Sequence, residues 1–226
     1  MNVRVQTKQI ILLTAERLFA EFGIDAVSIR QISKAAGQRN NYALQYHYGD
    51  RDTLINEILT LRAVPINQRR LAMLADIEEN NRTDNIAALA HAFVWPLAEH
   101  IILNKDSYYL RFLLHLYYYR QGNGLFYNFA PALRTGFNKV VRYIRLCLVN
   151  LPTEIMDARL SLIGAQLINA MALWEENIMQ NSDNREAELN LLAANLEDVF
   201  VGSLQAPMSE QTRKQLVNAK KPSLAN

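Results

Sequence analysis

Side chains that can hydrogen-bond nucleic acid are concentrated between Gly37 and Gly49. If Asn40 or Asn41 is the N-cap of a short helix, Leu44 and Tyr48 lie four residues apart and can face a core. The side chains left to face outward or sideways are Asn41, Tyr42, Gln45, Tyr46 and His47. Amides can pair with adenine through two hydrogen bonds, and hydroxyl and imidazole groups can bond phosphate oxygens. This face therefore suits a DNA groove better than a protein core.

The chain ahead of this face has the pattern of two helices joined by a turn. Apolar residues recur at helical spacing over 7–22, and Gly23 follows as a residue able to take a left-handed C-cap. Ser28 and Gln31 have the spacing of a capping box, which predicts a second helix near 29–36. Ala35-Ala36-Gly37 then supplies small residues for close helix crossing and a glycine for a tight turn. With a third helix near 41–48 and Asp50 as the cap of a fourth, the pattern predicts a helix-turn-helix module.

Residues 7–62 resemble the DNA-binding domain of the TetR family of transcriptional regulators. The resemblance rests on a helix ending at Phe22-Gly23, on Ser28, on the turn Ile-Ser-Lys-Ala-Ala-Gly, and on Tyr46-His47-Tyr48 before a helix rich in Leu and Ile. The segment between Gly37 and the Tyr-His pair is one residue longer than in most members. This leaves open which of Arg39, Asn40 and Asn41 points at bases.

The resemblance implies two groups of DNA contacts. The expected phosphate contacts are Ser28, Tyr46, His47 and Arg51. The expected base-edge contacts are Asn41, Tyr42 and Gln45, with Arg39 and Asn40 beside them. Each side chain has a structural alternative: Ser28 could serve only as a cap, the Tyr-His pair could pack on the first helix, and Arg51 could pair with Asp50 or Asp52.

Composition is that of a globular chain and gives only a weak indication of DNA. Half of the 226 residues are hydrophobic and the net charge is +2, which is small for a nucleic-acid binder. The N-terminal segment is too polar for a signal peptide, and no run approaches the roughly 20 apolar residues of a membrane span. We therefore expect a cytoplasmic protein without a membrane partner. The single cysteine, Cys147, can form no internal disulfide.

Periodicity predicts an all-α chain with an N-terminal helix-turn-helix domain over 1–62, a helical ligand-binding and dimerisation domain over 63–205, and a flexible tail over 206–226. Pro65 is expected in the first turn of a helix, whereas Pro96 is expected to kink or divide one. The further helices are predicted near 51–63, 65–79, 84–103, 105–120, 130–150, 153–180 and 185–204.

The last two long helices carry wide apolar stripes. In the TetR family these helices form a four-helix interface between two copies, so the resemblance implies a homodimer. The candidate interface residues are Ile163, Leu167, Met171, Leu192, Leu196 and Val199. The alternative is that both stripes belong to the core of one chain. A two-fold dimer suits DNA with two half-sites about one helical turn apart.

The middle of the chain is unusually aromatic. In the family this region encloses the pocket of a small-molecule inducer, so aromatic walls suggest a small, largely apolar ligand of unidentified structure. The candidate walls are Trp95, Tyr109, Phe112, His115 and Trp174. The alternative is that most of these side chains are simply core.

No catalytic constellation is found in the sequence. The four histidines lack metal-ligand spacing, no nucleophile motif or phosphate-binding glycine loop is present, and Glu175-Glu176 is interpreted as a solvated helix face. We therefore expect no catalysis, cofactor or metal. The hypothesis is a repressor that binds a palindromic operator in double-stranded DNA as a dimer and is released by a ligand. The alternative is a regulator whose C-terminal domain docks a partner protein and binds no small molecule.

Overall fold

The computed structural model describes residues 3–38, 48, 50–119, 131–178 and 184–219. These residues form helices and no strand, so the all-α prediction is confirmed for the described part of the chain. The first helices are α1 (Val3–Phe22), α2 (Ile29–Ala35) and α4 (Arg51–Glu79). They are followed by α5 (Ile86–Leu103), α6 (Tyr109–Tyr118), the 3-10 turn η3 (Pro131–Arg134), α7 (Thr135–Cys147), α8 (Thr153–Ile178), α9 (Arg185–Gln205) and α10 (Glu210–Ala219).

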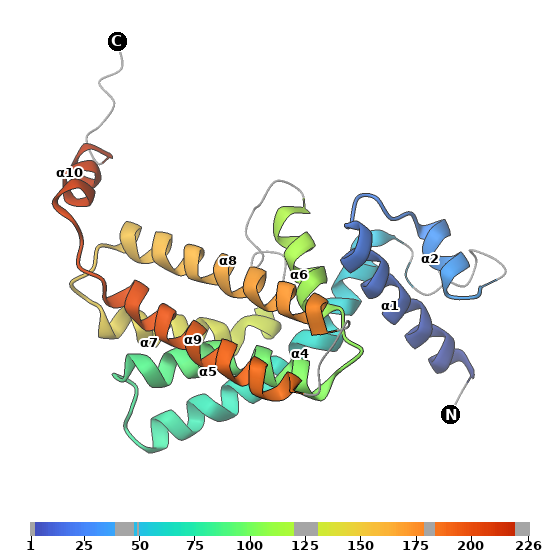
Figure 1. Cartoon of the computed structure of the whole chain (residues 1–226), viewed down its shortest axis with the longest axis horizontal. Helices are drawn as coiled ribbons and strands as arrows, with labels where there is room; N and C mark the ends of the chain where they lie inside the picture. Colours follow the sequence, from blue (N-terminus) through green and yellow to red (C-terminus); the bar gives the residue numbers. More distant parts are fainter. Residues whose placement is uncertain (1–2, 39–47, 49, 120–130, 179–183, 220–226) are drawn as a thin grey trace, which may run out of the picture.

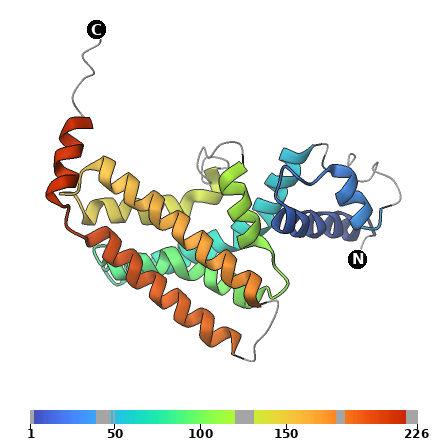
Figure 2. The ribbon, with the colours of Figure 1, turned by 45° about the horizontal axis from the view of Figure 1, so that its top comes forward.

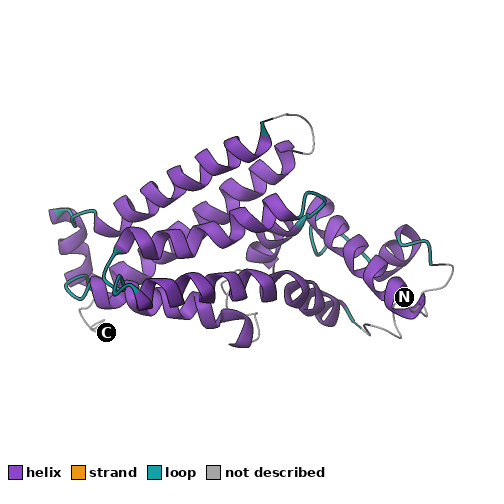
Figure 3. Ribbon diagram, turned by 90° about the horizontal axis from the view of Figure 1, so that it is seen from below, coloured by secondary structure: helices purple, strands orange, loops and turns teal. Residues whose placement is uncertain are grey.

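The helices form a small module at one end and a larger bundle beside it (Figures 1 and 2). The module holds α1, α2 and the first part of α4, while α5, α7, α8 and α9 lie in the bundle together with the second part of α4. Helix α6 packs against both α8 and α1, so it lies between the two parts. Figure 3, seen from below, shows the loops as short connections between long helices. Two helices, α4 and α6, therefore join the module to the bundle.

Local caps define the ends of the first helices as the sequence predicts. Gly23 has φ +84° and its amide bonds the carbonyl of Phe19 at 3.0 Å. Ser28 and Gln31 form both hydrogen bonds of the capping box, and Asp50 caps α4 by accepting from the amide of Thr53 at 2.8 Å. Gly37 has φ +69° and ends α2 with the paired hydrogen bonds of a Schellman motif. These confirmed caps fix the path of the chain up to residue 38.

Pro65 does not begin a helix, so the predicted break between 63 and 65 is wrong. The helix α4 continues through Pro65 from Arg51 to Glu79 and passes the predicted domain boundary at residue 62. A proline inside a helix leaves the carbonyl four residues earlier, here that of Leu61, without its helical donor. Leu61 and Pro65 lie on the exposed side of α4, where water can bond this carbonyl. The long helix is thereby tolerated.

Pro96 does not divide its helix either, for a different reason. Pro96 is buried in α5, and its missing N–H leaves the carbonyl of Ala92 without a helical donor in an environment that excludes water. Arg70 of α4 supplies the replacement. Its Nε donates to the Ala92 oxygen and its Nη2 to the Phe93 oxygen, both at 3.0 Å. The buried guanidinium thus completes the hydrogen bonding of α5 and holds α4 against it.

Residues 210–219 form helix α10, where the sequence predicts a flexible tail, and no residue of α10 is buried.

Helix α5 is long and apolar enough to cross a membrane, with a mean hydropathy of 1.6, but 56% of it is buried inside the protein. Its neighbours are α4, α7 and α9. The apolar character of α5 is therefore accounted for by its place in the bundle core.

Candidate functional site

The helix-turn-helix module is closed by Tyr48, the last residue of the predicted recognition segment. Tyr48 is 2% exposed, as its predicted inward register requires, and its hydroxyl donates to the carbonyl of Lys8 at 2.8 Å. Burial raises the pKa of Tyr48 above its ordinary value. The ammonium of Lys8 lies 5.5 Å from the centre of the Tyr48 ring and 3.2 Å from Glu57 of α4. The C-terminal end of the segment is thereby anchored to α1.

Ser28 and Arg51 are the two candidate DNA contacts within the described residues. Ser28 is exposed at the start of α2, and its hydroxyl accepts from the amide of Gln31 at 3.2 Å. Arg51 is the first residue of α4, and its Nη2 donates to the carbonyl of Val27 at 2.9 Å. Its Nη1 lies 3.8 Å from Asp25. Arg51 therefore links the starts of α2 and α4 through Val27 and Asp25, whereas the sequence alternative named Asp50 or Asp52 as its partner.

The other seven candidate DNA contacts, and almost all of the predicted helix 41–48, lie outside the described residues. They are Arg39, Asn40, Asn41, Tyr42, Gln45, Tyr46 and His47. What the structure fixes is where the segment leaves α2 and where it returns at Tyr48. Sequence reasoning did not single out Arg30 and Lys34, which are exposed on α2. Their spacing of four places both on one side of that helix, and this spacing could have indicated them.

A buried carboxylate joins the module to the rest of the chain. Glu16 of α1 is 1% exposed and accepts from Arg62 of α4 through two hydrogen bonds, from Nε at 2.8 Å and from Nη2 at 3.1 Å. It also accepts from the backbone N–H of Tyr108 at 3.0 Å, directly before α6. One side chain therefore ties α1, α4 and the beginning of α6 together.

A second buried carboxylate caps α6 from the opposite side, and here the sequence interpretation is wrong. Glu175 of α8 is 3% exposed, whereas a solvated helix face was expected. Its oxygens accept from the amides of Leu110 at 3.2 Å and Arg111 at 3.0 Å, which are donors that the first turn of a helix leaves unsatisfied. Burial raises its pKa to about 7, while the two amides act in the opposite direction.

The middle of α6 contacts the DNA-binding module. The ring of Phe112 lies 6.2 Å from that of Phe19 in α1, and both side chains are fully buried. The imidazole of His115 lies beside Gly23, so close that a Cβ at this glycine would be 3.5 Å from Nδ1. Phe112 and His115 were predicted as pocket walls. Instead they form the contact between α6 and the end of α1.

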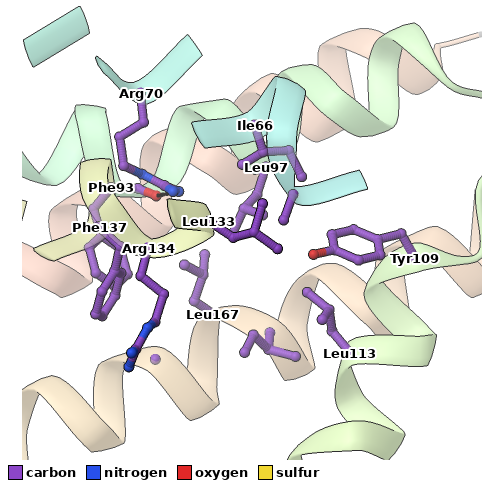
Figure 4. Close-up of a pocket in the computed structure, with 13 residues that line it drawn as sticks. Ile66, Arg70, Phe93, Leu97, Tyr109, Leu113, Leu133, Arg134, Phe137 and Leu167 are labelled. Carbon is purple, nitrogen blue, oxygen red and sulfur yellow. Dashed lines mark hydrogen bonds between the residues drawn. The ribbon is translucent and has the colours of Figure 1, made fainter. Parts of the chain in front are cut away.

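A cavity of about 60 Å³ lies within the bundle, between α4, α5, α6, η3, α7 and α8. Figure 4 shows the hydroxyl of Tyr109 directed toward Leu133 in its interior. Most of the lining is apolar, with Arg70 and Arg134 as the charged members. The lining residues are Ala63, Ile66, Arg70, Phe93, Leu97, Tyr109, Leu113, Leu133, Arg134, Phe137, Gly164, Leu167 and Ile168.

Of the five predicted pocket walls, Tyr109 alone lines this cavity. Trp95 is half-buried and stacks on His91, with ring centres 5.6 Å apart. Trp174 is half-buried in α8 and is absent from the lining. The lining is predominantly aliphatic, with Phe93, Tyr109 and Phe137 as its aromatic members.

The predicted dimer residues divide into buried and half-buried ones. Ile163, Leu167, Met171 and Leu196 are at most 7% exposed within the single chain. They pack inside the bundle and offer no surface to a second copy. Leu192 and Val199 are half-buried. The large apolar residues that α8 and α9 do expose are Leu162 (70%), Leu173 (50%) and Leu191 (73%). None of these three belongs to the stripes predicted from periodicity.

No group of three His, Cys, Asp or Glu residues that could hold a metal ion occurs within the described ranges.

A compact module with these caps, joined to a helical bundle, defines a helix-turn-helix DNA-binding protein. Residues 11–58 match the model of the family described as "Bacterial regulatory proteins, tetR family". This part of the chain is therefore a DNA-binding domain of the TetR family.

Comparison with one solved structure agrees with this fold. A putative TetR family transcription regulator from Shewanella sp. PV-4 is similar with a TM-score of 0.54 and 15% identity, over 84% of this chain and 96% of that one. A putative TetR-family transcriptional regulator from Mesorhizobium loti MAFF303099 gives a TM-score of 0.42 at 15% identity, over 89% and 98% of the two chains. No curated protein is significantly similar in sequence.

Proposed function

We propose that this regulator is a cytoplasmic repressor that binds a palindromic operator as a homodimer and is released by a small ligand bound in the cavity. The observation that carries the proposal is the position of α6. Tyr109 and Leu113 of α6 line the cavity, while Phe112 and His115 of the same helix contact α1. A ligand that displaces α6 must therefore act on the DNA-binding module.

The two buried carboxylates support this coupling. Glu16 holds the amide of Tyr108 from the module, and Glu175 holds the next free amides of α6 from α8. The start of α6 is thus bonded to both parts of the protein. Because closely packed helices move as units, a shift of α6 at the cavity is transmitted to α1 through these bonds.

The exposed apolar residues of α8 and α9 support the dimer. These helices lie side by side on one face of the bundle (Figures 1 and 2), and Leu162, Leu173 and Leu191 are exposed on them. Leucines exposed on adjacent helices are typical of an interface. We assign the contact to this outer face, which replaces the buried part of the stripe predicted from periodicity.

The DNA contacts are proposed on both sides of the segment 39–47. Asn41, Tyr42 and Gln45 are assigned to base edges, with Arg39 and Asn40 beside them, and Tyr46 and His47 are assigned to phosphates. Ser28 at the start of α2 and Arg51 at the start of α4 are assigned to phosphates as well. The cations Arg30 and Lys34 on α2 add positive charge to the same part of the module.

The DNA assignment is tested with an operator series in which each base pair is changed in turn. Gln45→Ala should cost about 1–3 kcal/mol at one base position, whereas His47→Ala should weaken binding to all sequences alike. Arg69→Ala is the matched control, since Arg69 pairs with Glu99 at 2.7 Å in the bundle. If Gln45→Ala leaves every base preference unchanged, the assignment of the recognition face is wrong.

A further inference from the structure

The charged groups of the bundle cavity are two arginines with no acidic counterpart. Arg70 and Arg134 line the cavity, and no Asp or Glu is among its described lining residues. Neither arginine forms an ion pair with the described part of the chain. The charged groups on the described lining of the cavity are therefore both positive.

Backbone carbonyls use only some of the hydrogen-bond donors of Arg70. It is 7% exposed, and Nε and Nη2 donate to the carbonyls of Ala92 and Phe93. Its Nη1 has no hydrogen-bond partner within the described part of the chain. Two neutral carbonyls do not balance a buried positive charge, which is costly without an anion nearby. Burial accordingly lowers the pKa of Arg70 to about 10, a value at which it stays charged near pH 7.

Arg134 has an unsatisfied donor. It lies at the junction of η3 and α7, and its Nε is buried with no hydrogen-bond partner among the described residues. Figure 4 shows the side chain extending from η3 toward α8. A buried donor left without a partner is unfavourable, so a ligand that accepts from it recovers this free energy.

We propose that the cavity selects a ligand bearing a carboxylate, which Arg134 and Arg70 hold, and an apolar body that fills the aliphatic remainder. This inference rests on the proposed function, since it names the chemical class of the ligand that would release the DNA. Guanidinium groups hold carboxylates through charge-assisted hydrogen bonds, which are about twice as strong as neutral ones. The hydroxyl of Tyr109, which points inward (Figure 4), adds a further polar group.

The size of the cavity indicates a compact ligand. At about 60 Å³ it is smaller than the roughly 300–1,000 Å³ of pockets for drug-sized molecules. A single aromatic ring or a short branched chain beside the carboxylate suits the surroundings of Leu97, Leu113 and Phe137. Suitable probes are benzoate, phenylacetate and 3-methylbutanoate, each compared with its neutral amide of nearly equal shape.

Binding of these probes to the full-length protein is measured by calorimetry. Release of the protein from DNA is measured on fragments that the protein has selected from genomic DNA. At least one carboxylate should bind more tightly than its amide by a factor of about ten or more. Arg134→Gln should abolish this preference and Arg134→Lys should retain part of it. Arg145→Gln, which removes an exposed arginine of the same α7 helix, should leave the preference unchanged.

Each outcome decides a separate question. Equal binding of acid and amide, a preference that survives Arg134→Gln, or no binding by any of the carboxylates overturns the anion site. Selective binding that leaves the protein on DNA supports the site and contradicts its role in release. Release by the neutral amides alone retains the proposed function and overturns the carboxylate.

Discussion

The pairing of Arg70 with the backbone ahead of Pro96 leads to a double-mutant experiment. Arg70→Met removes the donors to the carbonyls of Ala92 and Phe93, while Pro96→Ala returns an N–H to the Ala92 carbonyl from within α5. If Arg70 replaces the donor that proline lacks, the two substitutions must couple. Arg70→Met should then be less harmful when residue 96 is alanine.

The magnitude of the coupling follows from the hydrogen bonds. A buried carbonyl left without a donor costs about 1–3 kcal/mol, and in the chain that keeps Pro96 this cost falls on the Ala92 carbonyl, since the helical donor of the Phe93 carbonyl is the N–H of Leu97. With alanine at 96, the Ala92 carbonyl has its helical donor again. The cost of Arg70→Met should therefore fall by about 1–3 kcal/mol. The free energy of desolvating the guanidinium is common to both backgrounds and cancels.

The assay is urea unfolding at one protein concentration, followed by the fluorescence of Trp95 and Trp174. Both tryptophans lie in the bundle, on α5 and α8, so they report on the part of the protein that is changed. Arg69→Met serves as the control because Arg69 is exposed and pairs with a side chain, Glu99. It should be additive with Pro96→Ala within about 0.5 kcal/mol. Equal costs of Arg70→Met in the two backgrounds would refute the reasoning.

Three further predictions concern the carboxylates and the dimer. Glu16→Gln breaks a buried ion pair and should lower the free energy of unfolding, measured in urea, by about 3–5 kcal/mol. Glu21→Gln, which breaks an exposed pair, should lower it by at most about 1 kcal/mol, and equal effects of the two substitutions would contradict this prediction. Burial raises the pKa of Glu175 from 4.5 to about 7 in the folded chain, so its contribution to stability is complete below pH 4.5 and is lost as the pH rises to 7. The free energy of unfolding of the wild type minus that of Glu175→Gln should fall by about 3 kcal/mol over this range, and a difference independent of pH would be inconsistent with a buried carboxyl. Leu191→Glu should convert the dimer to monomer in light scattering, whereas Leu103→Glu, which changes an equally exposed leucine outside α8 and α9, should not; a Leu191→Glu dimer would rule out the proposed interface.

The helix-turn-helix module is predictable from sequence because its turns are decided locally. Gly23, Ser28, Gly37 and Asp50 each act within a few residues of their own position, through a left-handed conformation or a capping hydrogen bond. The effects of Pro65 and Pro96 are not local. One depends on which side of α4 faces water, and the other on an arginine 26 residues earlier in the chain.

The cavity and the buried acids could not be predicted for the same physical reason. A glutamate such as Glu175 is usually solvated, and the amides that it bonds lie 64 and 65 residues away in the sequence. Periodicity places an aromatic residue on the inner face of a helix. It does not say whether that face meets a neighbour, as Phe112 meets Phe19, or a cavity, as Tyr109 does. The charge of Arg70 and Arg134 within an apolar cavity becomes visible only when η3 and α4 are brought together.

The measurement that tests the central claim most directly is selection of genomic DNA fragments by the full-length protein, followed by sequencing. Bound fragments should share a motif with two-fold symmetry, whose half-sites are separated by about one turn of the double helix or a multiple of it. Binding to this motif should exceed binding to unrelated DNA by about a thousandfold or more at physiological salt. Recovery of fragments with no common sequence would contradict the account.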